Sequence, residues 1–361
     1  MQGKIEISLE QIKSNWKSLN LASNGKAAAV VKADAYGFGM IKITKTLINA
    51  GCKYFYVANI NEATQLRNSI KNQNINIAVF EGLIEGTEKE YINYNLTPII
   101  NNLNQLKRLH FLSKQEKKIS AILNINTGMN RLGLNSNEID FLLKNREMVN
   151  NLEWDFIMSH LANSEDVKNN TNNQQLNEIL KFSKNFPHIK LSLSNSGGIM
   201  LGQKFCLDQT RPGLGLYGIN SYGDNIRVNS KNLKLPLKIY APVIQIKEVG
   251  VGEPISYGGI DITSKRSLLA TIGIGYADGW IRLLKQNKFI NIDKEKCNIM
   301  GHITMDSFVL DITKVTKNLL EEGDYLCLLD NSNIKELLKG LNLISYELLT
   351  LMGSRLIREY K

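Results

Sequence analysis

Apolar residues in the first two thirds of the chain gather in eight short runs, and the stretches between them have a helical pattern. In segments such as 61–69 and 136–146 the apolar residues recur at three- and four-residue spacing, as in amphipathic helices. Buried strands that alternate with helices predict parallel strand–helix–strand units. We expect eight such units to close into a (β/α)8 barrel of the TIM type, although an open doubly wound sheet fits the same periodicity. The eight runs are residues 27–32, 54–60, 75–80, 97–100, 119–126, 153–160, 189–195 and 205–211.

The pattern changes near residue 235. Beyond it, β-like runs are separated by turns rather than helices, which predicts a mostly antiparallel second domain. We therefore expect an α/β plus β protein, with a barrel domain at residues 1–235 and a C-terminal β domain at 236–361. The predicted strands are 236–249, 267–276, 288–293, 297–312 and 324–329, and a final helix is predicted at 344–352.

Composition agrees with a globular protein of about two domains. The chain has 361 residues, of which 43% are hydrophobic and 22% charged. The net charge of +10 raises the question of nucleic-acid binding, but the lysines are scattered, and the densest cluster, Lys114, Lys117 and Lys118, has no interleaved aromatic residues. A solvated basic surface is the better interpretation, so we expect no nucleic-acid partner.

No apolar stretch is long enough for a membrane span, and the first residues, MQGKIEISLE, lack the apolar core of a signal peptide. We therefore expect a cytoplasmic protein without a membrane partner. The four cysteines lie far apart without a CxxC pair, which predicts neither a disulfide scaffold nor a cysteine metal site.

Residues that can carry chemistry stand where the apolar runs end, which is where a parallel barrel places its functional groups. A lysine, two arginines, a histidine and a serine–glycine turn on one rim would suit an anionic, carbonyl-bearing ligand. Each has an ordinary explanation by itself: Lys32 as a surface lysine, His160 as a structural histidine, and SNSGG as a plain turn. Their joint occurrence at successive strand ends favours a site. The residues are Lys32, Tyr36, Arg131, His160, Asn195, Ser196 and Arg211.

Nine ordered motifs resemble those of the alanine racemase family, and the resemblance runs from Ile5 to Arg358. They are VVKADAYGFG, TGMNRLG, SHLA, SNSGG, RPGLGLYG, ISYGG, IGYADGW, GHITMD and SYELL. The resemblance implies a pyridoxal 5'-phosphate-binding barrel, a C-terminal β domain and a head-to-tail homodimer whose subunits complete each other's active sites. It also implies the interconversion of L- and D-alanine, an isomerase reaction that supplies D-alanine for bacterial peptidoglycan.

The family chemistry gives two residues a catalytic role. Pyridoxal phosphate joined to an amino acid as an imine spreads the negative charge left at Cα. Lys32 matches the lysine that holds the cofactor and acts as one base, and Tyr257 of ISYGG matches the base on the opposite face. A tyrosine pKa of about 10 suits neutral pH poorly, so positive charge from His160 and Arg211 is expected to lower it. Arg211 matches the residue facing the pyridine nitrogen, where it would disfavour transamination.

The resemblance also implies a larger binding set. The phosphate would be held by Tyr36, Ser196 and Tyr346 together with the backbone of Gly213 and Leu214. Arg131, Met305 and Tyr276 match the residues that contact the substrate. The complete cofactor set is Lys32, Tyr36, Arg131, His160, Asn195, Ser196, Arg211, Gly213, Leu214 and Tyr346.

Four positions depart from the frequent family pattern. Asn124 stands where many relatives have a lysine that positions Arg131, and its amide could do so only by a neutral hydrogen bond. The other departures are Asn130, His302 and Thr304. None removes a catalytic group, but together they bear on turnover and substrate breadth.

Three alternatives remain at this point. Racemisation of serine or of a broader set of amino acids fits the same fold. A non-catalytic pyridoxal-phosphate carrier needs only the barrel, so the C-terminal motifs argue against it. A decarboxylase of the related barrel would pair the pyridine nitrogen with an acidic group, whereas Arg211 stands here.

Overall fold

The computed structural model describes residues 1–70, 74–115, 119–219, 233–287, 289–316, 319–338 and 345–361. The chain divides into two compact units, residues 11–234 and residues 1–10 with 235–361. The junction at 234/235 lies one residue from the predicted boundary. The first ten residues, however, belong to the C-terminal unit, because β1 (Lys4–Ile7) pairs with β9 (Leu237–Val249) and β17 (Ile357–Tyr360). A four-residue strand has the same alternation in any sheet, so its sequence could not show which sheet it joins.

The first unit is a parallel barrel. Its strands follow one another in chain order and every neighbouring pair is parallel. The strands are β2 (Ala29–Val30), β3 (Tyr54–Val57), β4 (Asn76–Val79), β5 (Thr97–Ile100), β6 (Ala121–Asn124), β7 (Trp154–Met158) and β8 (Leu191–Ser192). The eighth position is filled by two bridged residues: Gln209 pairs with Ser192, and Thr210 pairs with Ala27. The sheet therefore closes, and the predicted barrel is confirmed.

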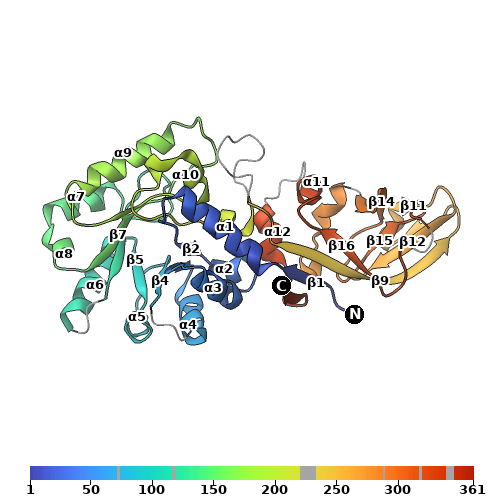
Figure 1. The fold of residues 1–361 in the computed structure, drawn as a ribbon, viewed down its shortest axis with the longest axis horizontal. Coiled ribbons are helices and arrows are strands. Elements are labelled where there is room, and N and C mark those ends of the chain that lie inside the picture. Colours follow the sequence, from blue (N-terminus) through green and yellow to red (C-terminus); the bar gives the residue numbers. More distant parts are fainter. Residues whose placement is uncertain (71–73, 116–118, 220–232, 288, 317–318, 339–344) are drawn as a thin grey trace. The chain divides into compact units, whose positions relative to one another are not determined.

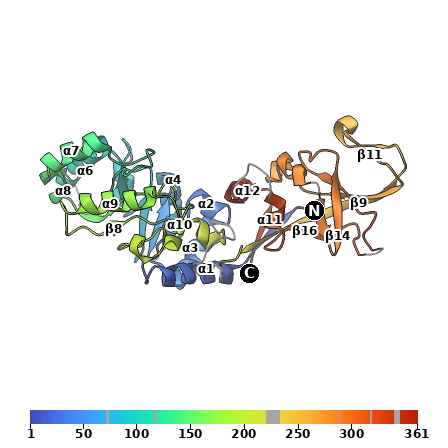
Figure 2. The same ribbon diagram turned by 90° about the horizontal axis from the view of Figure 1, so that it is seen from above.

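Helices lie outside the barrel strands (Figures 1 and 2). The inward cluster of buried residues contains Val30, Tyr56, Ile99, Ile122 and Met158 among others, so the barrel has a packed core. The helices of this part are α1 (Leu9–Ala22), α3 (Met40–Asn49), α4 (Ile60–Ser69), α5 (Glu88–Asn93), α6 (Leu103–Gln115), α7 (Ser136–Lys144), α8 (Glu147–Asn150), α9 (Thr171–Ser183) and α10 (Ser196–Leu201).

The C-terminal unit is built on one large sheet with the strand order β13-β14-β15-β12-β9-β1-β17, and β16 also pairs with β9. All pairings in it are antiparallel except β1 with β17, so the predicted class is confirmed. Figure 1 shows the long strand β9 running through this unit. The remaining strands are β12 (Ser267–Ile272), β13 (Phe289–Ile292), β14 (Glu295–Met300), β15 (Phe308–Asp311) and β16 (Tyr325–Leu329).

A small hairpin and two short helices complete the C-terminal unit. The hairpin pairs β10 (Pro254–Ile255) with β11 (Asp261–Ile262), and the helices are α11 (Ile334–Leu338) and α12 (Ser345–Leu351). The predicted run 297–312 contains two strands, β14 and β15, because Gly301 takes a positive φ and the chain turns there. Across the described ranges, no helix has the length and apolar composition that crossing a membrane requires.

Candidate active site

Lys32 follows strand β2 and begins an unusual turn, α2 (Lys32–Tyr36). The four residues after the lysine, Ala33 to Tyr36, all have φ between 51° and 57°, although none is glycine. A left-handed conformation costs an L-residue about 1–2 kcal/mol, so surrounding contacts must hold this turn. The Ala33 N–H donates to Glu62 Oε1 at 2.7 Å, and the Met40 N–H donates to Asp34 Oδ1 at 2.7 Å. The segment after the lysine is thereby held in one conformation.

The Lys32 amine lies above the barrel core. Its Nζ is 5.6 Å from the centre of the Phe80 ring, which packs against the inward cluster. Burial and then the positive charge of Arg131 lower the pKa of Lys32 below its ordinary value, while Glu62 opposes them. At a given pH, the neutral amine, which is the nucleophilic and proton-accepting form, is therefore more populated than in a solvent-exposed lysine.

Arg211 is completely buried at the end of the eighth barrel position. Its Nη2 donates to the carbonyl oxygens of Ser159 at 2.6 Å and Leu193 at 3.2 Å, and its Nη1 donates to Ser192 Oγ. Its Nε has no hydrogen-bond partner among the described residues, although it is buried. A buried donor without an acceptor is costly, so this N–H is suited to an acceptor atom of a bound ligand. Burial lowers the pKa of Arg211 to about 10, and the guanidinium stays charged at neutral pH.

His160 lies beside Arg211 and is neutral. Its Nδ1 is 3.4 Å from Arg211 Nη2, and its Nε2 is 3.5 Å from the Asn195 amide nitrogen. Burial, followed by the positive charge of Arg211, lowers the pKa of His160 to about 3. Arg131 and Lys32 add to this effect. The prediction that His160 contributes positive charge toward a tyrosine is therefore wrong, because the ring carries none at neutral pH.

Ser196 and Gly213 form a compact cradle with Tyr36. Ser196 Oγ accepts hydrogen bonds from the N–H groups of Gly213 and Gly215, both at 3.0 Å. A Cβ atom at Gly213 would lie 2.6 Å from the Tyr36 hydroxyl, so only glycine allows this approach. Asn195 caps α10 by accepting a hydrogen bond from the Gly198 N–H at 2.9 Å. Hydroxyl groups and close backbone at a helix start suit a phosphate group.

Arg131 stands on an exposed loop that Asn126 organises. Asn126 Oδ1 accepts from the N–H groups of Gly128 and Asn130, at 3.1 and 3.0 Å. The Asn130 residue takes a left-handed φ of 56°, where a glycine is frequent in the family. Asn124 is buried below this loop and donates to Asn101 Oδ1 at 2.7 Å. The amide nitrogen of Asn124 is thus engaged by Asn101, and only its amide oxygen could accept a hydrogen bond from the Arg131 guanidinium.

The C-terminal unit carries the remaining predicted residues. The Tyr276 N–H donates to the Thr304 carbonyl at 3.0 Å, and the Ala277 N–H donates to the Met305 carbonyl at 3.1 Å. Tyr276 and Met305 are therefore neighbours. Tyr257 lies at the tip of the β10–β11 hairpin and is 77% exposed. Tyr346 is half-buried in α12.

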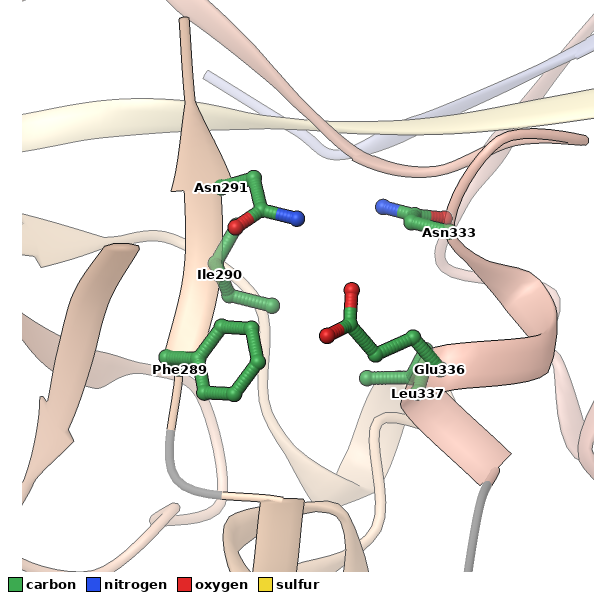
Figure 3. Close-up of a pocket in the computed structure, with 6 residues that line it drawn as sticks. All are labelled: Phe289, Ile290, Asn291, Asn333, Glu336 and Leu337. Atoms are coloured by element: carbon green, nitrogen blue, oxygen red, sulfur yellow. The ribbon is translucent and has the colours of Figure 1, made fainter. Parts of the chain in front are cut away.

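A pocket between β13 and α11 is a separate feature of this unit (Figure 3). Glu336 at its edge pairs with Lys296 at 3.4 Å, and Asn333 donates to the Leu328 carbonyl at 2.9 Å. Glu336 and Asn333 thus have partners within the unit, and the predicted site residues lie elsewhere. The lining residues are Phe289, Ile290, Asn291, Asn333, Glu336 and Leu337.

The predicted site residues thus fall into two groups. The first group, from Lys32 to Leu214, lies in the barrel unit, and the second group, from Tyr257 to Tyr346, lies in the C-terminal unit. Leu214 directly follows Gly213 and begins the short 3-10 helix Leu214–Tyr217. Sequence reasoning missed four residues that hold the barrel set in place. Three are Glu62, Ser159 and Ser192, and the fourth is Gln175, whose amide donates to the His160 carbonyl at 2.8 Å. Ser159 is adjacent to His160 in the SHLA motif, which was a usable signal, whereas the other three stand in ordinary strand or helix patterns.

A closed parallel barrel with a half-buried lysine and a buried arginine at its strand ends, joined to a β unit, defines a class of two-domain barrel protein whose functional groups stand at the carboxyl ends of the strands. The family model for the alanine racemase N-terminal domain matches residues 7–221. The family model for the alanine racemase C-terminal domain matches residues 237–360. The chain belongs to the alanine racemase family, an isomerase family, as its motifs predict.

Individual relatives agree over the whole chain. An alanine racemase of Rickettsia bellii (strain RML369-C) is 38% identical over 341 residues, which cover 94% of this chain and 82% of the relative. An alanine racemase of Rickettsia africae (strain ESF-5) is 36% identical over 359 residues, which cover 99% of this chain and 98% of the relative. The crystal structure of alanine racemase from Bartonella henselae with covalently bound pyridoxal phosphate is 35% identical, has a TM-score of 0.93 and is matched over 100% of both chains.

Proposed function

We propose that this chain interconverts L- and D-alanine with pyridoxal phosphate bound covalently to Lys32. The observation that carries the proposal is the buried Arg211 Nε–H, which no described residue accepts, in the same barrel as a lysine whose pKa is lowered. A carbonyl compound could bind covalently to the Lys32 amine, and an acceptor atom in its ring could accept a hydrogen bond from the Arg211 Nε–H. The family assignment and the cofactor named for the Bartonella henselae relative support the same choice.

The residues of the barrel fit this cofactor. The Ser196 hydroxyl, the Tyr36 hydroxyl and the Gly213 backbone would hold its phosphate, with Leu214 as a further contact. The family resemblance adds Tyr346, which belongs to the C-terminal unit. Arg211 Nε would donate to its ring nitrogen, and Asn195 and His160 would line the ring. Because Arg211 is charged but poorly able to give up its proton, the ring nitrogen would stay unprotonated. When bound, pyridoxal phosphate supplies electron withdrawal that makes the Cα proton acidic.

Inversion at Cα needs proton transfer on two faces. Lys32 would move the proton on one face as a neutral amine, which its lowered pKa favours. Tyr257 would move it on the other face, and Arg211 is the remaining source of positive charge for that phenol. Arg131, Tyr276 and Met305 would contact the substrate, and Arg131 would pair with its carboxylate.

We further propose a homodimer with shared active sites. In the single chain, Tyr257 is 77% exposed and Met305 52% exposed, and Ile260 and Ile262 on the same hairpin are also exposed. Exposed apolar side chains gathered beside proposed substrate residues favour coverage by a second copy. A cytoplasmic enzyme supplying D-alanine for peptidoglycan is the role consistent with this activity.

The decisive experiment is incubation of the purified protein with L-alanine in heavy water. Chiral analysis together with the deuterium content at Cα should show D-alanine and α-deuterated L-alanine. Loss of carboxylate would indicate a decarboxylase, and unchanged L-alanine would indicate a carrier; both outcomes contradict the proposal. The same assay with L-serine measures substrate breadth.

Borohydride trapping tests the attachment of the cofactor. The wild-type protein should yield a reduced pyridoxal-phosphate adduct on the peptide that contains Lys32, and Lys32→Ala should yield none. An adduct on another lysine would contradict the assignment.

Mixed dimers test the shared sites. Inactive Lys32→Ala and Tyr257→Phe proteins should regain part of the activity when subunits are exchanged, because one hybrid site carries both native residues. Absence of recovery despite demonstrated exchange would contradict catalysis across subunits.

A further inference from the structure

Glu62 joins the turn after Lys32 to the neighbouring strand end. It lies in the first turn of α4, where its own N–H donates to the capping residue Asn59 at 3.0 Å. Its carboxylate reaches outward: Oε1 accepts from the Ala33 N–H at 2.7 Å, and Oε2 accepts from the Ala58 N–H at 2.8 Å. Both oxygens therefore hold backbone outside α4.

The hydrogen bond from the Ala33 N–H to Glu62 holds a backbone segment whose conformation is unfavourable by itself. Ala33 immediately follows Lys32 and is the first of four non-glycine residues with left-handed φ. Such a run is intrinsically unfavourable by about 1–2 kcal/mol per residue, so it depends on contacts from outside. A charge-assisted hydrogen bond to its first N–H is among the stronger contacts that can hold it.

The same carboxylate acts on Lys32 through charge. Among the described residues, Arg131 and Glu62 are the charged side chains that shift the pKa of the Lys32 amine, with opposite signs. His160 is neutral at working pH, and the Phe80 ring lies under the amine without a charge. Glu62 therefore supplies the negative charge that balances Arg131 at this lysine.

We infer that Glu62 is a positioning residue of the Schiff-base lysine: its carboxylate holds the left-handed turn that follows Lys32 and fixes a negative charge at the backbone next to that lysine. The inference rests on the proposed function, since it concerns the lysine that would carry the cofactor. It is distinct from catalysis by Glu62 itself, because the carboxylate binds backbone N–H groups.

The chain contains a closely matched control in Glu138. This residue occupies the corresponding position of α7, with its N–H donating to the cap Asn135 at 3.1 Å. Its carboxylate accepts from the Asn135 N–H at 3.0 Å and, one unit back in the barrel, from the Leu103 N–H at 3.0 Å. Glu138→Gln removes the same kind of clamp from a helix start that carries no site lysine.

The test measures the titration of the lysine nitrogen in the pyridoxal-phosphate-loaded protein. The visible absorption of the bound cofactor is followed against pH for wild type, Glu62→Gln, Glu62→Asp and Glu138→Gln, and circular dichroism verifies that each folds. Removing a negative charge disfavours the protonated nitrogen, so Glu62→Gln should move the midpoint to lower pH by about half a unit to one unit. Glu62→Asp keeps the charge and should recover most of the shift, while Glu138→Gln should leave the midpoint unchanged. Glu62→Gln should also slow the reaction of added pyridoxal phosphate with the cofactor-free protein.

An unchanged midpoint in Glu62→Gln, or an equal shift in Glu138→Gln, would overturn the inference while leaving the proposed function intact. If Glu62→Gln does not fold, Glu62→Asp decides through the reaction of added pyridoxal phosphate with the cofactor-free protein. Its shorter side chain should loosen the turn at Ala33 and slow this reaction relative to Glu138→Gln, and equal rates in the two variants would overturn the inference. Failure of the proposed function has a different result, namely no trapped adduct on Lys32 in wild type.

Discussion

The side-chain amide of Gln175 in α9 donates a hydrogen bond to the carbonyl oxygen of His160 at 2.8 Å. The same Nε2 lies 3.2 Å from Thr127 Oγ1, and the amide oxygen accepts from the Ala162 N–H at 2.8 Å. Thr127 is in turn 2.7 Å from Ser159 Oγ. One buried amide therefore ties the strand end that carries His160 to the loop that carries Arg131.

Gln175→Leu should damage both stability and substrate binding. It removes the partners of the His160 carbonyl and the Ala162 N–H, two partly buried hydrogen bonds that contribute about 0.5–1.5 kcal/mol each. Because Thr127 begins the loop of Arg131, KM for alanine should rise more than kcat falls. Thermal unfolding and steady-state kinetics measure the two effects. Gln174→Leu, at the exposed neighbouring position, is the matched control, and equal behaviour of the two variants would contradict the positioning role.

Gly213→Ala should weaken cofactor binding. The new Cβ would lie 2.6 Å from the Tyr36 hydroxyl, so the phenol must move out of the cradle. We expect the Kd of pyridoxal phosphate to rise about tenfold, equivalent to about 1.4 kcal/mol. Gly250→Ala is the control, because its Cβ would be 3.9 Å from the nearest atom, in Glu253. Titration of the cofactor-free proteins with pyridoxal phosphate, followed by absorbance, compares them; equal affinities would contradict the cradle.

His160 should destabilise the protein in acid. Its folded pKa of about 3 lies below the value of about 6.5 for an unfolded histidine, so the unfolded chain binds more protons between these values. The contribution to stability is full above about pH 6.5 and decreases by up to about 1.4 kcal/mol per pH unit as the pH falls toward 3. His160→Gln should flatten this part of the profile of unfolding free energy against pH. The exposed His188→Gln should leave it as in wild type, and a parallel loss of slope would show that His160 is not the cause.

Tyr257→Phe should impair the two directions of racemisation through different steps. A phenol that serves one face only is the proton acceptor in one direction and the donor in the other. Kinetic isotope effects with α-deuterated L- and D-alanine should therefore change unequally. Tyr325→Phe, at another exposed tyrosine of the same unit, is the control. Full activity of Tyr257→Phe in both directions would remove this residue from the mechanism.

Local pattern was sufficient for the barrel strands and for the residues at their ends. The apolar run at 27–32 predicted β2 with Lys32 directly after it, and the Ser196 and Gly213 segments were predicted as separate loops at neighbouring strand ends. Burial within a parallel sheet leaves a continuous apolar run that can be seen in one sequence. Pairing between distant segments leaves no such mark, which is why the membership of β1 in the C-terminal sheet was not predicted.

The supporting contacts were missed for a related reason. Glu62 has the spacing of a helix-capping residue, and its reach to Ala33 depends on how α4 packs beside the preceding unit. Gln175 is one of two adjacent glutamines in a polar helix, and only its burial distinguishes it from Gln174. The neutrality of His160 follows from burial next to Arg211, which residue type alone cannot show.

The sequence by itself determined the order of strands and helices, the family and the chemical groups available at the strand ends, because these depend on residue types and their spacing. Only the tertiary structure decided which backbone N–H each side chain holds, that the buried Arg211 Nε–H has no hydrogen-bond partner among the described residues, and that His160 is uncharged. Those properties depend on distances and solvent exclusion between segments far apart in the chain, and a linear pattern contains neither.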